Sequence, residues 1–230
     1  SHYIIMTRRK IDMKLSNDTR EVLKNYSTIN ANLLVTSGNQ IATMSQMKNI
    51  VSKATLPDTF EKEFAICDLN EFLSAMSLFD DPDLEFGDNS VKISQGGQSL
   101  NYFYSDPTVV TTPKSDITMP DASAVFTLKQ SVFNQVLKAS SVLGVPDMVV
   151  DVDGEGNMSI RVSDRKNDTS NSFSVALEGK SEVQDQKFYF KVENLKLLSG
   201  DYEVQVSHKG ISNFKNLNKN VEYFIALEAA

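Results

Sequence analysis

The stretch Ala122–Leu143, ASAVFTLKQSVFNQVLKASSVL, predicts a short strand at Ala124–Leu128 that leads directly into a helix at Gln130–Leu143. Small or apolar side chains recur at helical spacing on one face, at Phe133, Val136, Leu137 and Ser140. No carboxylate lies between Asp121 and Asp147, whereas two lysines do. An acid-free helix in an acidic chain indicates that charge is sorted in space, although an ordinary solvated helix face is the simpler interpretation.

A similar stretch near the start of the chain suggests an internal repeat. LSNDTREVLKNYSTI resembles LKQSVFNQVLKASSVL, and the shared triplets Val22-Leu23-Lys24 and Val136-Leu137-Lys138 lie about half the chain length apart. Each half then continues with short alternating strands, turn signals and a second apolar-periodic segment. The sequence therefore predicts an α+β fold of two similar domains.

The expected domain boundaries follow from composition. Residues 105–120, SDPTVVTTPKSDITMP, carry three prolines and many small polar residues, which is typical of an extended connector. We expect an N-terminal domain at 13–112 and a C-terminal domain at 113–230. Residues 1–12 are interpreted as an extension that precedes a natural start at Met13.

Composition excludes several classes of protein. The net charge of −7 argues against a surface that coats nucleic acid everywhere, but it allows a basic lining inside an acidic exterior. No apolar run is long enough to cross a membrane. The single cysteine, Cys67, is expected to be buried, and it favours a reducing cytoplasm. No phosphate loop, dinucleotide fingerprint, metal-ligand spacing or catalytic constellation is present, so we expect no metal, no cofactor and no enzymatic activity.

Five stretches resemble the DNA polymerase sliding clamp of T-even-type tailed bacteriophages. They are MKLSNDTREVLKN from Met13, FAICDLNEFLSAMSL from Phe64, SDPTVV from Ser105, ASAV from Ala122 and YFIALEA from Tyr223. The resemblance implies a homotrimeric ring that encircles duplex DNA and tethers the replicative polymerase. It also implies clamp-loader and late-transcription partners and a place in the cytoplasm of the infected bacterial host.

In that family the strands form outer antiparallel sheets and two helices from each domain line the central hole. The resemblance places the lining helices at Ser16–Tyr26, Leu69–Phe79, Gln130–Leu143 and Lys191–Leu198. The implied DNA-facing side chains are Lys14, Arg20, Lys24, Lys129, Lys138, Lys191 and Lys196. Loosely placed cations suit a sequence-independent hold on phosphates.

The resemblance implies two further sites. A hydrophobic pocket under the connector would receive peptide tails of the polymerase and other partners, and its candidates are Val109, Val110, Ile117, Met119, Ile225 and Leu227. Sealing of the domain junction is the alternative role for these residues. The expected subunit interface holds Leu100, Tyr102, Phe103 and Tyr104, because three consecutive aromatics exceed what one buried strand face needs.

Two other functions remain compatible with the sequence. The first is a monomeric DNA-binding processivity factor that holds DNA through a basic face and loses it steeply as salt rises. The second is a β-rich structural protein of a virion, in which the repeat would serve a symmetric assembly.

Overall fold

The structure is a computed structural model, and residues 12–230 are the part of the chain that it describes. The expected extension at residues 1–12 lies outside the described residues, except for Asp12, which begins strand β1. No helix in residues 12–230 is long and apolar enough to cross a membrane.

The first half contains two α-helices, eight strands and one 3-10 turn. In chain order they are β1 (Asp12–Met13), α1 (Asn17–Ser27), β2 (Leu33–Val35), β3 (Gly38–Met44), β4 (Ile50–Phe60), β5 (Phe64–Ile66), α2 (Leu69–Met76), β6 (Asp83–Phe86), β7 (Ser90–Gln95), β8 (Gln98–Phe103) and η1 (Pro107–Val109).

The second half contains one α-helix, nine strands and one 3-10 turn. They are β9 (Ala124–Leu128), α3 (Gln130–Leu143), β10 (Asp147–Val152), β11 (Met158–Ser163), β12 (Phe173–Leu177), β13 (Gly179–Ser181), β14 (Gln186–Lys191), η2 (Val192–Asn194), β15 (Tyr202–Ser207), β16 (Ile211–Asn216) and β17 (Val221–Ala226).

The two halves share one plan of antiparallel pairing. In the first half β1 pairs with β6, β6 with β7, β7 with β8, β2 with β5 and β3 with β4. In the second half the same plan joins β9 to β15, β15 to β16, β16 to β17, β10 to β14 and β11 to β12. Single bridges extend the match, from Ala65 to Ser105 and from Tyr189 to Glu228. Strand β8 is therefore the counterpart of β17, and β4 is the counterpart of β12.

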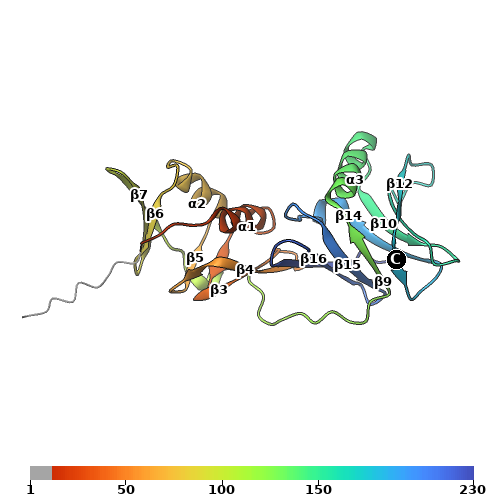
Figure 1. Ribbon diagram of the computed structural model, residues 1–230, viewed down its shortest axis with the longest axis horizontal. Coiled ribbons are helices and arrows are strands. Elements are labelled where there is room, and N and C mark those ends of the chain that lie inside the picture. Colours follow the sequence, from red (N-terminus) through yellow and green to blue (C-terminus); the bar gives the residue numbers. More distant parts are fainter. Residues whose placement is uncertain (1–11) are drawn as a thin grey trace, which may run out of the picture.

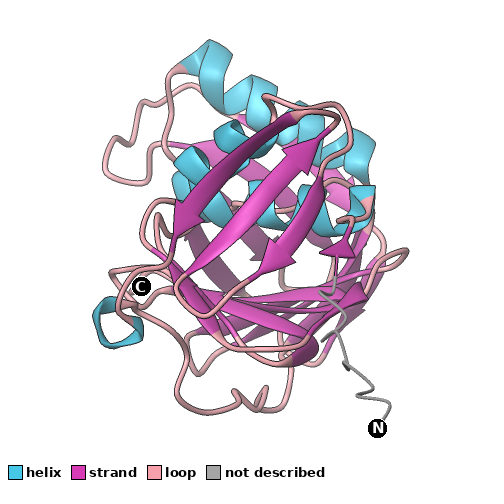
Figure 2. Ribbon diagram, turned by 90° about the vertical axis from the view of Figure 1, so that its left-hand side faces the viewer, coloured by secondary structure: helices cyan, strands magenta, loops and turns pink. Residues whose placement is uncertain are grey.

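A seven-stranded sheet runs through both halves in the order β13-β9-β15-β16-β17-β4-β3. Its central joint is the antiparallel pair β17–β4, in which Ile225 lies opposite Ile50 and Val221 lies opposite Ala54. All three helices lie on one side of this sheet, and the connector between β8 and β9 loops along the opposite side (Figures 1 and 2). One continuous cluster of buried apolar side chains fills both halves. The boundary between residues 112 and 113 stays a prediction.

At the N-terminus of each α-helix, a carboxylate accepts hydrogen bonds. The Asp58 carboxylate accepts hydrogen bonds from the Ser16 backbone N–H (2.9 Å) and the Thr19 hydroxyl (2.5 Å) at the start of α1. Asp68 caps α2 by accepting from the Glu71 N–H. Helix α3 has no acidic residue in its first turn, and Asp201, which precedes β15, accepts from its Gln130 N–H at 2.8 Å. A carboxylate at a helix N-terminus also complements the helix dipole.

The prediction of a fourth helix at Lys191–Leu198 is wrong, because only Val192–Asn194 form a single 3-10 turn. The backbone that follows is held by side chains from elsewhere. The Asn25 amide donates to the Lys196 carbonyl (3.0 Å), and the Leu198 N–H donates to the Tyr223 hydroxyl (3.0 Å). The Asn25 bond joins α1 of the first half to the second half. Cys67 also departs from expectation, because it is exposed at the start of α2.

Three buried tyrosines at this junction predict a loss of stability in alkali. Burial raises the pKa of Tyr202 to about 12, and it raises the pKa of Tyr26 and of Tyr223 even further above the ordinary value. In the unfolded chain all three deprotonate near pH 10. The contribution of the three protonated tyrosines to folding stability is therefore complete below about pH 10. It is lost as the pH rises toward their pKa values in the folded chain.

We expect these three tyrosines to lower the free energy of unfolding by up to about 4 kcal/mol per pH unit above pH 10, since each contributes about 1.4 kcal/mol per unit. Urea unfolding at closely spaced pH values between about 9 and 11.5 measures this slope. A free energy of unfolding that stays constant from pH 10 to pH 11 would contradict the burial of the three hydroxyls.

Candidate functional site

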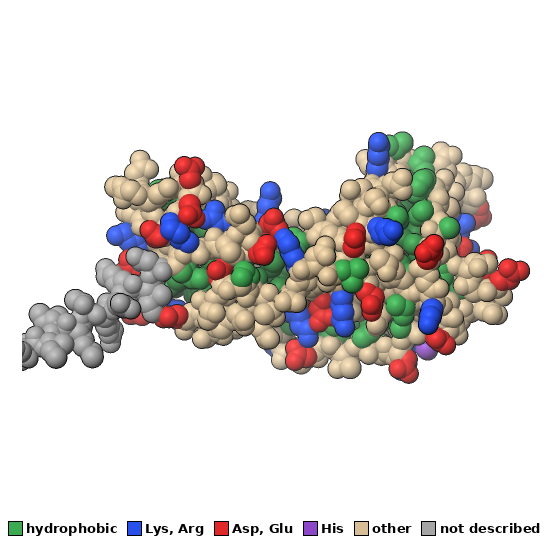
Figure 3. Space-filling view, viewed as in Figure 1, with side chains coloured by type: hydrophobic (Ala, Val, Ile, Leu, Met, Phe, Trp, Pro, Cys, Tyr) green, Lys and Arg blue, Asp and Glu red, His purple; other side chains and the backbone are tan. Residues whose placement is uncertain are grey.

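The face that carries the helices is concave. The space-filling view shows a hollow between the α1–α2 half and the α3 half, above the seven-stranded sheet (Figure 3). Acidic and basic side chains lie side by side on the N-terminal half in that view. This face holds the helices that the sequence predicts as the lining, apart from the missing fourth one.

Two of the predicted DNA-facing cations are tied to carboxylates. Lys14 Nζ lies 3.5 Å from Asp81 Oδ2 and 3.3 Å from Asp83 Oδ1, and it donates to the Asp81 carbonyl at 2.7 Å. Arg20 Nη2 lies 3.4 Å from Asp81 Oδ1. The Arg20 Nε is buried and has no hydrogen-bond partner. A single turn, the one that follows α2, thus neutralises two cations of the first half.

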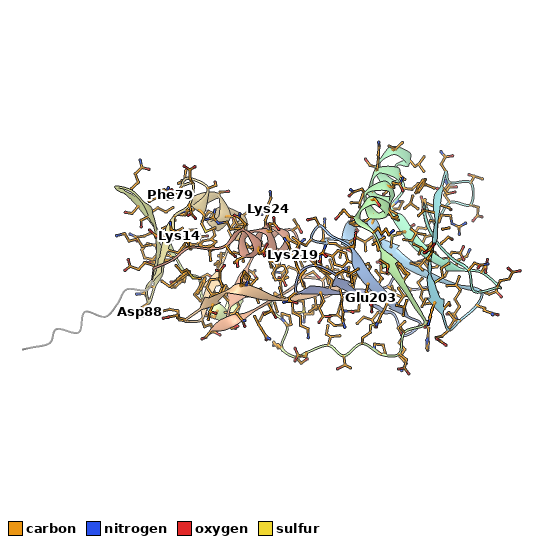
Figure 4. All side chains as sticks on the ribbon, viewed as in Figure 1. Lys14, Lys24, Phe79, Asp88, Glu203 and Lys219 are labelled. Carbon is orange, nitrogen blue, oxygen red and sulfur yellow. The ribbon has the colours of Figure 1, made fainter. Side chains whose placement is uncertain are left out.

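Lys24 is the remaining predicted cation of the first half. It is exposed on α1 and points away from the sheet (Figure 4). The neighbouring carboxylates of α1, Asp18 and Glu21, are paired with Lys219 from the turn between β16 and β17. That pairing raises the pKa of Lys219, chiefly through the hydrogen bond to Glu21. It is a second connection between α1 and the C-terminal half.

The predicted cations of the second half are not paired with carboxylates as Lys14 and Arg20 are. Lys129 and Lys138 are exposed at the start and in the middle of α3, Lys196 is exposed after η2, and Lys191 is half-buried at the end of β14. None of these four has a carboxylate within 4.0 Å among residues 12–230, whereas Lys14 and Arg20 do. These four lysines therefore present unpaired positive charge.

A cavity of about 600 Å³ lies between the connector and the outer face of the seven-stranded sheet. It is lined by Ala42, Lys53, Thr112, Pro113, Asp116 and Glu222, among others. Lys53 Nζ lies 3.6 Å from Glu222 Oε1 and 3.9 Å from Asp116 Oδ1. The cavity is more polar than the predicted pocket, and it includes none of the six residues predicted for that pocket.

Those six residues have different surroundings. Val109 is 63% exposed, and Val110, Ile117, Met119 and Leu227 are half-buried. Ile225 is 0% exposed because its side chain points into the core from β17, so its assignment to an open pocket needs correction.

A feature that the sequence did not reveal lies beside Val109. Asn30 is 3% exposed, and its amide donates to the carbonyls of Met44 and Thr111, both at 3.0 Å. It thereby holds the turn between β3 and β4 against the start of the connector. Met47, in that turn, is 84% exposed. Two exposed apolar side chains, Met47 and Val109, thus lie on segments joined through one buried amide.

Strand β8 forms one edge of the sheet β1-β6-β7-β8. Tyr102 and Tyr104 turn inward, where their rings contact Phe72 and Phe64 and burial raises the pKa of each to about 12. Leu100 is half-buried, whereas Phe103 is 71% exposed. The predicted aromatic run therefore leaves one ring, Phe103, without a partner in residues 12–230.

Comparisons with known proteins agree with this architecture. The family "gp45 sliding clamp, C terminal" matches residues 125–229, and the family "DNA polymerase processivity factor" matches residues 16–106. The sliding clamp of Vibrio phage KVP40 is 35% identical over 223 residues, which cover 94% of this chain and 100% of the relative. The sliding clamp of Enterobacteria phage T4 is 30% identical over 224 residues, which cover 94% and 97%.

A solved PCNA of A. fulgidus, bound to the C-terminal region of FEN-1, matches with a TM-score of 0.70 at 12% identity and covers 96% of this chain and 99% of that one. At this identity the likeness shows the fold alone, which is the DNA clamp fold. The extent of the phage matches goes further: the chain belongs to the sliding clamp family. The resemblance drawn from the sequence is confirmed, and membership agrees with the expectation that the chain is not an enzyme.

Proposed function

We propose that three copies of this chain close into a ring that encircles duplex DNA and tethers the replicative DNA polymerase in the cytoplasm of the infected bacterial host. A clamp loader and late-transcription factors would use the same ring. The observation that supports the proposal is the way in which the two halves of the chain are joined by a pair of strands. Strand β17 pairs with β4, whereas their counterparts β8 and β12 are both free edges of their sheets. A free edge presents unpaired backbone donors and acceptors that favour another strand.

The internal repeat supplies a register for the joint between subunits. Because the bridges of Ala65 and Tyr189 match, Ser105 corresponds to Glu228, and Leu100 therefore corresponds to Tyr223. Tyr223 lies opposite Ser52 in β4. Ser52 pairs with Thr43, the last buried residue of β3, and Phe173 pairs with Val162, the last buried residue of β11, so we align Phe173 of β12 with Ser52. Leu100 of one subunit would then lie opposite Phe173 of the next. Both side chains are half-buried and pack against the core, so the joint would be apolar.

This register predicts one efficient cross-link. Ser99 and Ser174, both exposed, would lie directly opposite each other across the joint, with Cβ atoms about 5 Å apart. In a Cys67→Ser background, a chain with Ser99→Cys and Ser174→Cys should form a covalent trimer under mild oxidation or with a short bifunctional thiol reagent. The matched control pairs Ser99→Cys with Ala176→Cys, a position about 7 Å further along the same face. Equal cross-linking in both would contradict the register.

The cross-linked trimer also tests the function. We expect the closed ring to thread onto a linear duplex with one anchored end, and to remain there in about 1 M NaCl once the free end is blocked by a bulky protein. Salt at that concentration screens phosphate contacts within about 3 Å, so only topology retains the ring. Cutting the duplex next to the block should release it.

The rival functions give other outcomes. A monomeric factor with a basic face would be washed off by salt whether or not the end is blocked. A virion structural protein would form an assembly that does not retain DNA. Loss of the ring at high salt despite the block would overturn the proposed encirclement.

Partner tails would bind on the outer side of the ring, beside the connector. The exposed Met47 supports this position, together with the five accessible residues of the predicted pocket, which include Val109 and Leu227. Apolar anchors of a partner peptide would gain about 1.5–3 kcal/mol each on burial there.

A further inference from the structure

The charges of the segments predicted to line the ring are divided unequally between the two halves. In the first half, residues 14–27 and 68–83 hold three cations and seven carboxylates. In the second half, residues 129–143 and 191–198 hold four lysines and one carboxylate, Glu193, and Asp201 adds a second carboxylate at the start of α3. The same surface that would meet DNA is therefore net acidic over α1 and α2 and net basic over α3 and η2.

The structure shows how two of these three cations of the first half, Lys14 and Arg20, are neutralised, whereas Lys24 is exposed. The turn after α2 places Asp81 within 3.5 Å of both Lys14 and Arg20, and Asp83 within 3.3 Å of Lys14. The Lys14 and Asp81 side chains are 51% and 62% exposed, so each pair adds little to folding stability. Their separation is far below the Debye length of about 8 Å at physiological salt, so to a phosphate the paired charges nearly cancel.

We infer that the second half carries the phosphate contact, and that Asp81 and Asp83 mask Lys14 and Arg20 from DNA. The inference rests on the proposed encirclement of duplex DNA. In a ring of three copies, three attractive sectors formed by α3 and η2 would alternate with three masked sectors formed by α1 and α2. DNA would be held by one sector at a time rather than by a uniform lining, which weakens the grip and favours sliding.

Two matched double variants test which half binds. One carries Lys129→Gln and Lys138→Gln, the other Lys14→Gln and Arg20→Gln, and each removes two positive charges per subunit. We expect the α3 variant to lose at least tenfold in affinity for an open-ended duplex at low salt, and to show a shallower dependence of affinity on salt. The Lys14 and Arg20 variant should remain within about twofold of the unaltered chain. Equal losses in both variants would overturn the inference.

A gain-of-binding variant tests the mask itself. Asp81→Asn with Asp83→Asn should bind the duplex three- to tenfold more tightly and show a steeper dependence on salt, because two cations per subunit become available. The gain should vanish when Lys14→Gln and Arg20→Gln are added. An unchanged affinity, or a gain that survives the loss of both cations, would contradict the mask.

Retention on an end-blocked duplex at high salt, measured on the same samples, distinguishes failure of the proposed encirclement of DNA from failure of the proposed division of charge. If the unaltered chain is not retained, the proposed function fails whatever the variants do. If it is retained and the two lysine-removing variants weaken equally, only the division of charge fails. Native mass should show a trimer for every variant, which keeps defects of assembly apart from defects of DNA contact.

Discussion

A chain carrying Phe103→Asp should be monomeric at concentrations at which the unaltered chain is a trimer. Phe103 is 71% exposed on the free edge strand β8, so the change removes no contact inside the subunit. At the proposed joint the aspartate forfeits about 2 kcal/mol of apolar burial at each of three interfaces. The three interfaces together lose about 6 kcal/mol. Because the assembly constant of a trimer varies with the square of the concentration at which half of the chains are assembled, that concentration should rise roughly a hundredfold. Light scattering over a dilution series measures that concentration.

Leu217→Asp is the matched control. Leu217 is 53% exposed in the turn between β16 and β17, away from both free edges. It should leave the mass and its dependence on dilution unchanged. If the two variants behave alike, Phe103 lies outside the joint.

The change Tyr223→Phe should lower the free energy of unfolding by about 2–4 kcal/mol. The Tyr223 hydroxyl donates to Asn25 Oδ1 at 2.6 Å and accepts from the Leu198 N–H at 3.0 Å. Phenylalanine fills the same space but leaves the buried Leu198 N–H without its partner, at about 1–3 kcal/mol, and removes the part-buried bond to Asn25, which contributes about 1 kcal/mol. Urea unfolding at fixed protein concentration gives the difference.

Tyr189→Phe is the control for this prediction. Arg165 stacks over the Tyr189 ring at 3.8 Å, and that contact does not need the hydroxyl. We therefore expect a change below about 0.5 kcal/mol at Tyr189. Equal effects at Tyr189 and Tyr223 would show that the hydroxyl at the domain junction contributes nothing specific.

The elements predicted best were those whose signals are local. Helix α3 begins and ends at the predicted residues, since its apolar stripe is uninterrupted and Gly144 adopts the left-handed conformation (φ 64°) that ends it. Tyr102, Phe103 and Tyr104 alternate inward and outward with the period of a strand. This is why the Phe103 ring is exposed while the two tyrosine rings pack inside the subunit.

The segment at Lys191–Leu198 was mispredicted for a physical reason. Leu195 and Leu198 are buried as helical spacing requires, yet the same spacing fits a 3-10 turn followed by extended chain. Bonds from Asn25 and Tyr223, far away in the sequence, occupy the Lys196 carbonyl and the Leu198 N–H that a helix would use. Local pattern contains no information about such competition.

The candidate sites were harder to predict because their properties depend on distant partners. The sequence marks Lys14 and Arg20 as cations, but it does not show that Asp81, 61 residues from Arg20, sits against both. Likewise the resemblance places Ile225 in the peptide pocket, whereas its side chain on β17 is buried in the core. Free edges such as β8 and β12 are visible only once the pairing order is known.

The joint between β17 and β4 also sets the order of events during synthesis. Ser52 in β4 bonds to the Glu222 carbonyl, 170 residues further along the chain. On the ribosome, β4 therefore emerges long before its partner and waits with an open edge. Contacts of such long range slow folding, and an unpaired strand edge on a nascent chain invites aggregation. The subunit should thus depend on chaperones at 37 °C more than a chain whose halves close separately.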